Sequence, residues 1–582
     1  MSRSKNILQW WCSLRSNSTP TPCSHIRSSK TFPPTTCSRL QIHVRYASTR
    51  SVLSEGDSAS SRHAQKVQQI STAVNDFHIR NEKFRIYHGS TNSTRPRNQS
   101  HKTNIVNTSS LNEVLKVDRE NGYVIAEPNV SMDRLVEATL EHNLIPKVVM
   151  EFPGITVGGG YSGTSGESSS FRHGFFDQTI NNVEMVLADG SIVKASREEN
   201  ADLFNGAAGA LGTFGITTKV EIQVIPAKRY VEVEYHPVRS VAEALAVTRK
   251  ATSDTNVDYV DGILYSQTSG AIIVGRMVDR PTHAATPIRT FSRPEDPWFY
   301  MHVQSLINPD NPSNSSPVVE CIPLPDYLFR YDRGGFWVGR SAFSHLHFPF
   351  TPFTRRWLDD FLHTRMLYSA LHASGQSRTY LVQDLAMPYD SVDEFVKYTD
   401  ENLKIWPLWL CPLKQSPGPT MHPHYPIQPA PSSSHDNKTT NSNTNPEQPL
   451  MNIGLWGTSP TLSHSYPSFL TANTALEQKL TSLGGMKWLY AHTYYSPTQF
   501  WSQFNKTWYD DLRKKYKAEG LLNVYEKVSI DVDAQRAEME TFRSRVLGIW
   551  PLGAMWGIWK SIQSKSYVEA RRAKWRSWRG PS

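Results

Sequence analysis

The sequence predicts an α+β fold, in which a first α+β unit is followed by a second one from about residue 227. Two hairpin signals, Asn121-Gly122 and Asp189-Gly190, lie between apolar runs and indicate antiparallel strands. Between them lies a glycine-rich segment, 151–170, and the polar run 164–174 has no apolar period and poor helix propensity. A doubly wound parallel sheet is therefore not expected.

The glycine-rich segment is the clearest sign of a ligand site. Five glycines lie from Gly158 to Gly166, so the backbone turns freely and a ligand can approach bare amides. Successive N–H groups, with hydroxyls such as Ser162 and Thr164, suit a pyrophosphate. Residues 158–163 also satisfy G-x-G-x-x-G, but the flanking strand and amphipathic helix of a nicotinamide fingerprint are missing. Taken alone, the segment fits a mobile Gly/Ser surface loop equally well.

Strands and one helix are expected before this segment. Apolar runs predict strands at 104–107, 115–118 and 123–128, the last two joined across Asn121-Gly122. Ser131 is expected to cap a short helix with Leu135, Val136 and Leu140 on one face. Residues 145–149 then lead into the glycines.

A second hairpin is expected after it. Strands at 183–187 and 191–193 flank Asp189-Gly190. The segment 202–217 closes the unit before a strand at 219–225. Beyond it, strands at 230–233, 262–266 and 271–274 begin the second α+β unit.

These motifs together resemble the flavin-binding domain of the vanillyl-alcohol/p-cresol methylhydroxylase (PCMH-type) superfamily. The shared features are a Pro-Gly-x-Thr-Val-Gly-Gly loop, an Ala-Asp-Gly hairpin and an Asp-Leu-Phe run with spaced glycines, at 153–159, 188–190 and 202–215. The resemblance implies a two-subdomain PCMH-type FAD-binding domain with an α+β substrate cap domain, and FAD as the cofactor. Non-covalent FAD is expected, because His88 does not lie in the Gly-Gly-His pattern of members that attach it. The cofactor-binding residues implied by position are Thr156, Val157, Gly158, Gly159, Gly160, Ser162, Gly163, Thr164, Gly166, Glu167, Ser168, Gly209, Gly212 and Gly215.

Nine short strings in register, between about 84 and about 528, are similar to the delta-24 sterol reductase group. They include 167–170, 187–191, 407–412 and 489–491. The resemblance implies FAD-dependent reduction of a side-chain carbon–carbon double bond in a sterol or another isoprenoid, with a hydride from NADPH passing through flavin N5. The sequence contains no recognisable separate nicotinamide domain, so NADPH would reach the flavin through the same site.

The chain is expected to divide into six parts. Residues 55–226 form the FAD-binding domain, 227–414 the substrate cap, and 451–530 the C-terminal part of the cap returning to the flavin. Between 415 and 450 the composition becomes Pro, Ser, Asn, Thr and His, which predicts a disordered insertion. The terminal parts, 1–54 and 531–582, differ from the rest in charge and aromatic content.

The segment 487–495 holds the candidate catalytic residues. Its alternating pattern predicts a strand, which presents every second side chain to a cavity. Reducing an isolated alkene needs a proton as well as a hydride, and Tyr490 and His492 are the candidate acids. A purely structural aromatic strand is an equally good interpretation. Glu151 and Glu167 flank the glycines and would bind ribose or cap the segment.

Residues 1–54 have the composition of an organellar transit peptide. They contain eight Lys and Arg, twelve Ser and no Asp or Glu. Arg45-Tyr46-Ala47-Ser48 resembles a mitochondrial processing site, so a mitochondrial membrane-associated location is expected, with the endoplasmic reticulum as the family-based alternative. A disordered basic tail is the other interpretation.

The rest of the chain is nearly neutral, so its composition gives no support for nucleic-acid binding, and none is expected. Without residues 1–54 the chain has 54 Lys and Arg against 53 Asp and Glu. Only Cys321 and Cys411 remain there, so neither a disulfide framework nor a metal site is expected. Cys411 fits a core thiol.

The C-terminal residues indicate a membrane surface. Residues 546–559 are apolar and Trp-rich but contain Pro551 and are too short to span a bilayer, which takes about 20 residues. A basic run follows, as in interfacial segments on anionic lipid. A helix packed on the body of the protein is the alternative.

Two further functions remain open from the sequence. One is an FAD-linked oxidase or dehydrogenase of an aldonolactone or hydroxy acid on the same fold. The other is a membrane-associated scaffold that retains FAD without turnover.

Overall fold

The computed structural model describes residues 55–89, 104–307, 317–374, 380–424, 449–460, 465–541, 549 and 552–581. All of them belong to one compact unit. The predicted transit segment 1–54 lies outside the described residues, as does 425–448 of the predicted insertion.

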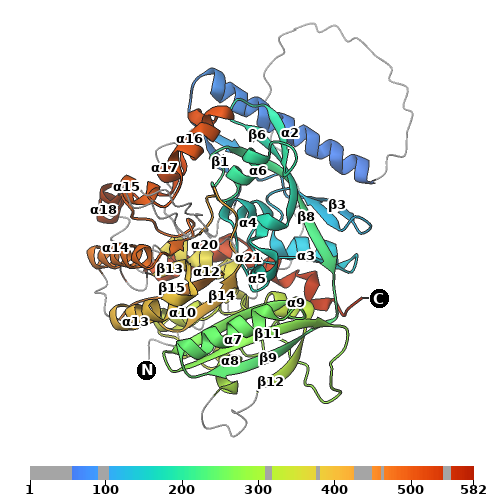
Figure 1. Ribbon diagram of the computed structural model, residues 1–582, viewed down its shortest axis with the longest axis vertical. Coiled ribbons are helices and arrows are strands. Elements are labelled where there is room, and N and C mark those ends of the chain that lie inside the picture. The colour runs from blue at the N-terminus through green and yellow to red at the C-terminus, as the bar shows by residue number, and fades with distance from the viewer. Residues whose placement is uncertain are drawn as a thin grey trace, which may run out of the picture. The chain divides into compact units, whose positions relative to one another are not determined.

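The first part of the chain builds a six-stranded antiparallel sheet (Figure 1). Its order is β3 (Val114–Asp118), β4 (Tyr123–Ala126), β8 (Gly215–Pro226), β6 (Ile180–Leu187) and β7 (Ile192–Ser196), and β5 (Leu144–Pro146) also pairs with β8. Both predicted hairpins are present, as β3–β4 and β6–β7. Gly122 and Gly190 adopt φ values of 67° and 86°, which glycine tolerates best. The predicted α+β class is confirmed.

Helix α3 (Met132–Leu140) follows β4, with Ser131 at its N-cap as predicted. The Ser131 hydroxyl makes no capping bond, however, and donates to Asp133 instead. The buried face of α3 carries the predicted Leu135, Val136 and Leu140. The shorter elements of this part are β1 (Arg85–Tyr87), which pairs in parallel with β2 (Ile105–Asn107), and the helices α5 (Ser170–His173) and α6 (Ala201–Ala207).

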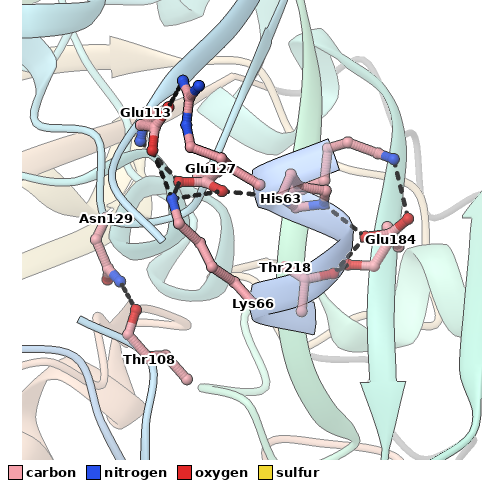
Figure 2. Close-up of polar contacts among 10 residues, drawn as sticks. His63, Lys66, Thr108, Glu113, Glu127, Asn129, Glu184 and Thr218 are labelled. Carbon is pink, nitrogen blue, oxygen red and sulfur yellow. Dashed lines mark hydrogen bonds and ion pairs between the residues drawn. The ribbon is translucent and has the colours of Figure 1, made fainter. Parts of the chain in front are cut away.

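The long helix α2 (Glu55–Ile79), absent from the sequence-based expectation, packs against β2, β3 and β6. A polar network joins it to the sheet (Figure 2). His63 is buried between two carboxylates, with Nδ1 2.8 Å from Glu127 and Nε2 2.9 Å from Glu184. Burial alone lowers the pKa of His63, but the hydrogen bonds to both carboxylates raise it above its ordinary value. The Lys66 ammonium also forms an ion pair with Glu127, with Nζ 3.1 Å from Oε2.

The second part of the chain builds an eight-stranded sheet (Figure 1). Its order is β12 (Val318–Pro323), β9 (Tyr230–Val238), β11 (Ser269–Val278), β10 (Tyr259–Ser266), β14 (Leu408–Leu413), β15 (Leu450–Gly457), β13 (Leu381–Pro388) and β16 (Met486–Lys487). The three predicted strands of this unit lie within β9, β10 and β11. The strand pairs are antiparallel throughout.

Both faces of this sheet are buried, in two separate cores. In β14, Leu408 and Leu410 point into one core and Trp409 and Cys411 into the other, as the period of a strand requires. Helices α7 (Val241–Ser253), α13 (Val392–Asn402) and α14 (Tyr466–Ser482) cover the first face. The second face joins the core of the six-stranded sheet. Burial raises the pKa of the Cys411 thiol, as expected for a core thiol.

The second part of the chain contains further helices. They are α8 (Phe299–Leu306), α9 (Leu324–Leu328), α10 (Val338–Leu346), α11 (Pro352–Trp357), α12 (Thr364–Ser374), α15 (Pro497–Trp501), α16 (Lys506–Lys515), α17 (Val524–Val528), α18 (Val532–Glu540), α20 (Leu552–Gln563) and α21 (Ser566–Arg571). Among the described residues, none of the helices combines the length and apolar character needed to cross a membrane.

Helix α20 packs along α12, so residues 552–581 do not form a separate tail. An added Cβ at Gly557 would lie 3.0 Å from the Ala370 carbonyl oxygen, which shows how closely the two helices approach. The Ser561 hydroxyl donates to the Met366 carbonyl at 3.0 Å. Further on, Trp575 is buried against Phe329, with ring centroids 5.0 Å apart. The contacts of this face of α20 agree with the alternative interpretation, in which the C-terminal residues form a helix packed on the body of the protein.

Residues 415–424 correct the predicted start of the disordered insertion. Met421 and His422 are buried, and His422 Nε2 lies 2.9 Å from the Asp177 carboxylate. The His422 ring also packs on Phe175, with centroids 5.1 Å apart. The polar composition concealed these contacts, which depend on residues distant in sequence. At the other end, Leu450 already belongs to β15.

Candidate functional site

A cavity of about 1740 Å³ lies between the glycine-rich segment and the second sheet. Residues from 85 to 217 line one part of it, and residues from 265 to 558 line the rest. Pockets for one drug-sized ligand measure roughly 300–1,000 Å³. The cavity therefore has room for two ligands of moderate size side by side.

The glycine-rich segment forms a short helix, α4 (Val157–Gly163), and not the irregular loop expected from its composition. Thr156 caps it, its side-chain oxygen accepting from the Gly159 amide at 3.2 Å. Packing explains why glycine is needed within the helix. An added Cβ at Gly158 would lie 2.7 Å from the Pro128 Cβ, and one at Gly160 would lie 2.5 Å from the Met150 Cε. Tertiary contacts thus override the low helix propensity of glycine.

Most of the residues predicted to bind the cofactor line the cavity. Gly163 borders it with no atom within 4 Å of an added Cβ. Glu167 is 6% exposed, and its Oε2 atom has no hydrogen-bond partner among the described residues. The cavity-lining members of the predicted set are Thr156, Gly158, Gly159, Ser162, Gly163, Gly166, Glu167, Gly212 and Gly215.

The other predicted residues do not line the cavity but support the segment behind it. Val157 and Gly160 are buried in the core. The Thr164 carbonyl accepts from the Trp488 indole at 2.8 Å, and the Ser168 carbonyl accepts from the Val260 amide at 2.8 Å. Gly209, with a φ of 75°, allows the close approach of the Met421 carbonyl. Thr164, Ser168 and Gly209 thus tie the residues that follow α4 to the second part of the chain.

Basic residues line the same end of the cavity as the glycines. Lys527 borders it beside Gly212 and donates to the Leu211 carbonyl. Arg85 and His88, from β1 and the residue following it, line it as well. A lone lysine in 525–528 carries no recognisable motif, so sequence reasoning missed Lys527.

The prediction of a strand over residues 487–495 is wrong. Only Met486 and Lys487 pair with β13, after which the chain turns away. Tyr490 lines the cavity, whereas His492 lies in the core beyond it, where its ring stacks on Tyr494. The two candidate acids therefore do not face one cavity. The buried Lys487 ammonium holds this turn by binding Glu477 at 2.9 Å and the His492 carbonyl.

Tyr490 forms a hydrogen bond with the carboxyl group of Asp384, which the sequence analysis did not identify as a site residue. Its hydroxyl donates to Asp384 Oδ2 at 2.6 Å, and Asn452 donates to Asp384 Oδ1 at 3.0 Å. Burial raises the pKa of Asp384 to about 6, and these hydrogen bonds partly offset the rise. Burial together with Asp384 raises the pKa of Tyr490 well above its ordinary value. The tyrosine is therefore a hydrogen-bond donor to Asp384 and a poor proton donor to a substrate.

A second cavity-lining carboxyl, Glu151, has the more strongly perturbed acidity. It is 5% exposed, and burial raises its pKa to about 8. Nearby, Arg330 is fully buried and lies 3.0 Å from Asp261. Two carboxyl groups whose environments separate their pKa values are typical of acid–base sites. The sequence could not reveal the raised pKa of Glu151, because that pKa depends on residues more than a hundred positions later in the chain.

Aromatic residues form another part of the cavity lining. Phe336, Trp409 and Trp456 all line the cavity. Phe336 contacts both tryptophans, with ring centroids 5.5 Å from Trp409 and 4.4 Å from Trp456. Such a surface suits an apolar ligand and offers ring faces to a positive charge.

Helix α20 completes the wall on the side of α12. Gly553, Ala554, Gly557 and Ile558 line the cavity. Leu552, Met555 and Trp559 on the same helix are 46%, 52% and 44% exposed. One helix thus borders the cavity and carries an exposed apolar surface.

Comparison with known proteins agrees with this arrangement. Residues 62–196 match the model of an FAD binding domain. The chain is 27% identical over 435 residues to Delta(24)-sterol reductase of Homo sapiens, covering 74% of this chain and 78% of that protein. It is 28% identical over 462 residues to Delta(24)-sterol reductase of Arabidopsis thaliana (75% and 80%), and 26% identical over 504 residues to a Delta(24)-sterol reductase homolog of Caenorhabditis elegans (81% and 88%).

Proposed function

We propose that this chain, an FAD-dependent oxidoreductase similar to Delta(24)-sterol reductases, reduces a side-chain carbon–carbon double bond of a sterol or related isoprenoid with NADPH as donor. The observation that carries the proposal is the mixed lining of the cavity. Glycine backbone and basic residues line part of the cavity, and aromatic rings and acidic groups also line it. A dinucleotide and an apolar alkene need these two environments in one cavity.

The residues at the glycine end fit FAD. Gly158, Gly159 and Gly163 present backbone without side chains, so a diphosphate can reach the chain closely. Lys527 and Arg85 would balance its negative charge, and Glu167 has a free carboxylate oxygen for a ribose hydroxyl. Bound there, FAD would supply the two-electron hydride chemistry that the reduction requires.

The acidic residues of the cavity define how protons are held during the reaction. Asp384, with its pKa raised to about 6, is mostly ionised at neutral pH and is fixed by Tyr490 and Asn452. Glu151 keeps its proton. The cavity thus offers one carboxylate and one carboxylic acid to a substrate lying along the aromatic wall.

Anaerobic stopped-flow absorbance of the full-length protein tests the proposal. NADPH should bleach the bound flavin, and a sterol with a delta-24 double bond should restore its colour in a second mixing step. A saturated sterol of the same skeleton is the control and should leave the flavin reduced. A flavin that NADPH leaves oxidised but an aldonolactone or hydroxy acid reduces would establish the dehydrogenase alternative. A flavin that no donor reduces would establish the scaffold.

We also propose that the outward face of α20 contacts a membrane surface. Leu552, Met555 and Trp559 are exposed, and the basic residues Lys560 and Lys565 follow them, which suits an interface with anionic lipid. A sterol leaving the lipid would then meet the cavity on the other face of the same helix. The composition of residues 1–54 supports a mitochondrial membrane, with the endoplasmic reticulum as the alternative.

Vesicle flotation checks the membrane contact. Replacing Leu552, Met555 and Trp559 together by serine should weaken binding to anionic vesicles at least tenfold, because each buried apolar side chain contributes about 1.5–3 kcal/mol. The matched control is Ile79→Ser at the end of α2, which is 73% exposed and lies outside α20. Binding that the triple variant retains in full would contradict the proposal.

A further inference from the structure

Glu151 lies where the glycine-lined end of the cavity meets the second part of the chain. It precedes α4 in sequence, but the charged groups that act on it, Arg330, Asp261 and Asp384, all come from beyond residue 260. It lines the cavity, and its Oε1 atom is buried without a hydrogen-bond partner among the described residues. Such an atom beside a cavity calls for a partner in the ligand.

The charges around Glu151 explain why it holds a proton. The Arg330 guanidinium faces Asp261 at 3.0 Å, and the Tyr331 hydroxyl and Trp409 indole donate to the same carboxylate. The Asp261 carboxylate already balances this buried cation, so Arg330 offsets only part of the cost of a second carboxylate. Burial chiefly, and then Asp261 and Asp384, raise the pKa of Glu151 to about 8, although Arg330 opposes the rise. The other titratable neighbours, Tyr327, Tyr331 and Cys411, stay neutral because burial raises their pKa values.

Resting on the proposed function, we infer that the carboxyl group of Glu151 is the acid that delivers the proton to the substrate double bond. The π electron pair forms a new C–H bond with this proton, and Glu151 is left as a carboxylate. The more substituted carbon becomes electron-deficient and needs a hydride, with both of its electrons; FAD held by the glycine-lined residues would supply it, with NADPH as the source of the electrons. One proton and one hydride are added in all, and Glu151 regains a proton from water after the product leaves.

The surroundings of Glu151 suit both the positive charge that develops on the substrate carbon and the negative charge that Glu151 gains. Phe336, Trp409 and Trp456 line the same cavity. Aromatic rings can attract a developing positive charge on carbon. The buried Arg330 opposes the cost of the carboxylate that forms. Asp384 is a weaker candidate, because it accepts hydrogen bonds from Tyr490 and Asn452 as a carboxylate.

The experiment is Glu151→Gln in the full-length protein loaded with FAD, with the two half-reactions measured separately. Bleaching by NADPH should keep its rate, because it requires no proton for the alkene. Recovery of the flavin with the delta-24 sterol should slow by about 10²–10⁴-fold, the usual contribution of a general acid. In the unaltered protein this recovery should also slow as pH rises through about 8, where Glu151 loses its proton. The variant should lose that pH dependence.

A second measurement follows the protonation of Glu151 directly and needs no turnover. Infrared difference spectra of the oxidised protein should show a protonated carboxyl band that titrates near pH 8 and is missing in Glu151→Gln. Glu151→Asp keeps a carboxyl and should recover part of the sterol-dependent rate. Glu167→Gln, the contrasting buried carboxyl of the cavity, should weaken FAD binding and leave the pH dependence in place.

The outcomes separate the inference from the proposed function. If sterol restores the flavin in the unaltered protein and equally fast in Glu151→Gln, the inference is overturned and the reductase stands. A carboxyl band that persists in the variant would also overturn it. If no delta-24 sterol restores the flavin of the unaltered protein, the proposed function fails and this inference fails with it.

Discussion

Replacing Arg330 by methionine should lower the free energy of unfolding by about 3–5 kcal/mol. Arg330 is fully buried, and its guanidinium faces Asp261 and lies over the rings of Tyr327 and Tyr331, 4.1 Å and 4.7 Å from their centroids. Methionine fills much of the same volume but carries no charge. The Asp261 carboxylate would remain buried without its cation, and this uncompensated charge accounts for most of the lost stability.

Urea unfolding monitored by tryptophan fluorescence measures this loss. The double variant Arg330→Met with Asp261→Asn removes both charges and should recover most of the stability. Arg249→Met is the matched control, because Arg249 pairs with Asp390 at the surface, with 53% and 94% of their side chains exposed, and should change stability by about 1 kcal/mol or less. An Arg330→Met variant as stable as the parent would contradict this expectation.

Two glycines of the same helix should respond oppositely to alanine. An added Cβ at Gly163 meets no atom within 4 Å and faces the cavity, so Gly163→Ala should leave the FAD-free protein as stable or more stable by up to about 1 kcal/mol. FAD affinity should fall at least tenfold, because the methyl group occupies space the cofactor would use. An added Cβ at Gly160 would lie 2.5 Å from Met150 and 2.8 Å from Phe176. Gly160→Ala should therefore destabilise the FAD-free protein by about 1–3 kcal/mol.

Thermal unfolding of the FAD-free variants and fluorescence titration with FAD check both expectations. Each glycine serves as the control for the other, because both lie in α4 and both become alanine. Unchanged FAD affinity in Gly163→Ala would mean that the cofactor does not approach this end of the helix.

Local turn chemistry made the hairpins predictable. Asn121-Gly122 and Asp189-Gly190 each lie between apolar strands, and only the residues of the turn and its flanks are needed to specify such a link. The long helix α2 was not predicted, although Val67, Ile70 and Val74 recur at helical spacing and share a buried apolar cluster with residues of the strands. Polar contacts, such as His63 between Glu127 and Glu184, add to this packing (Figure 2).

Local pattern failed where distant contacts dominate. Glycines 158–163 have poor helix propensity, yet Thr156 caps them and Met150, Pro128 and Phe176 enclose them as a helix. The segment 487–495 alternates like a strand, yet the Lys487 ammonium bonds to Glu477 and the pairing ends there. His492 is consequently in the core while Tyr490 reaches the cavity.

The sequence by itself determined the α+β class, the hairpins and the flavin-type glycine segment, because each depends on residues adjacent in the chain. Only the tertiary structure decided which acid faces the cavity and holds a proton. Glu151 owes its raised pKa to burial and to Asp261 and Asp384, which lie more than a hundred residues away in sequence. Acidity is set by solvent exclusion and by charges within a few ångströms, and the fold alone brings these groups together.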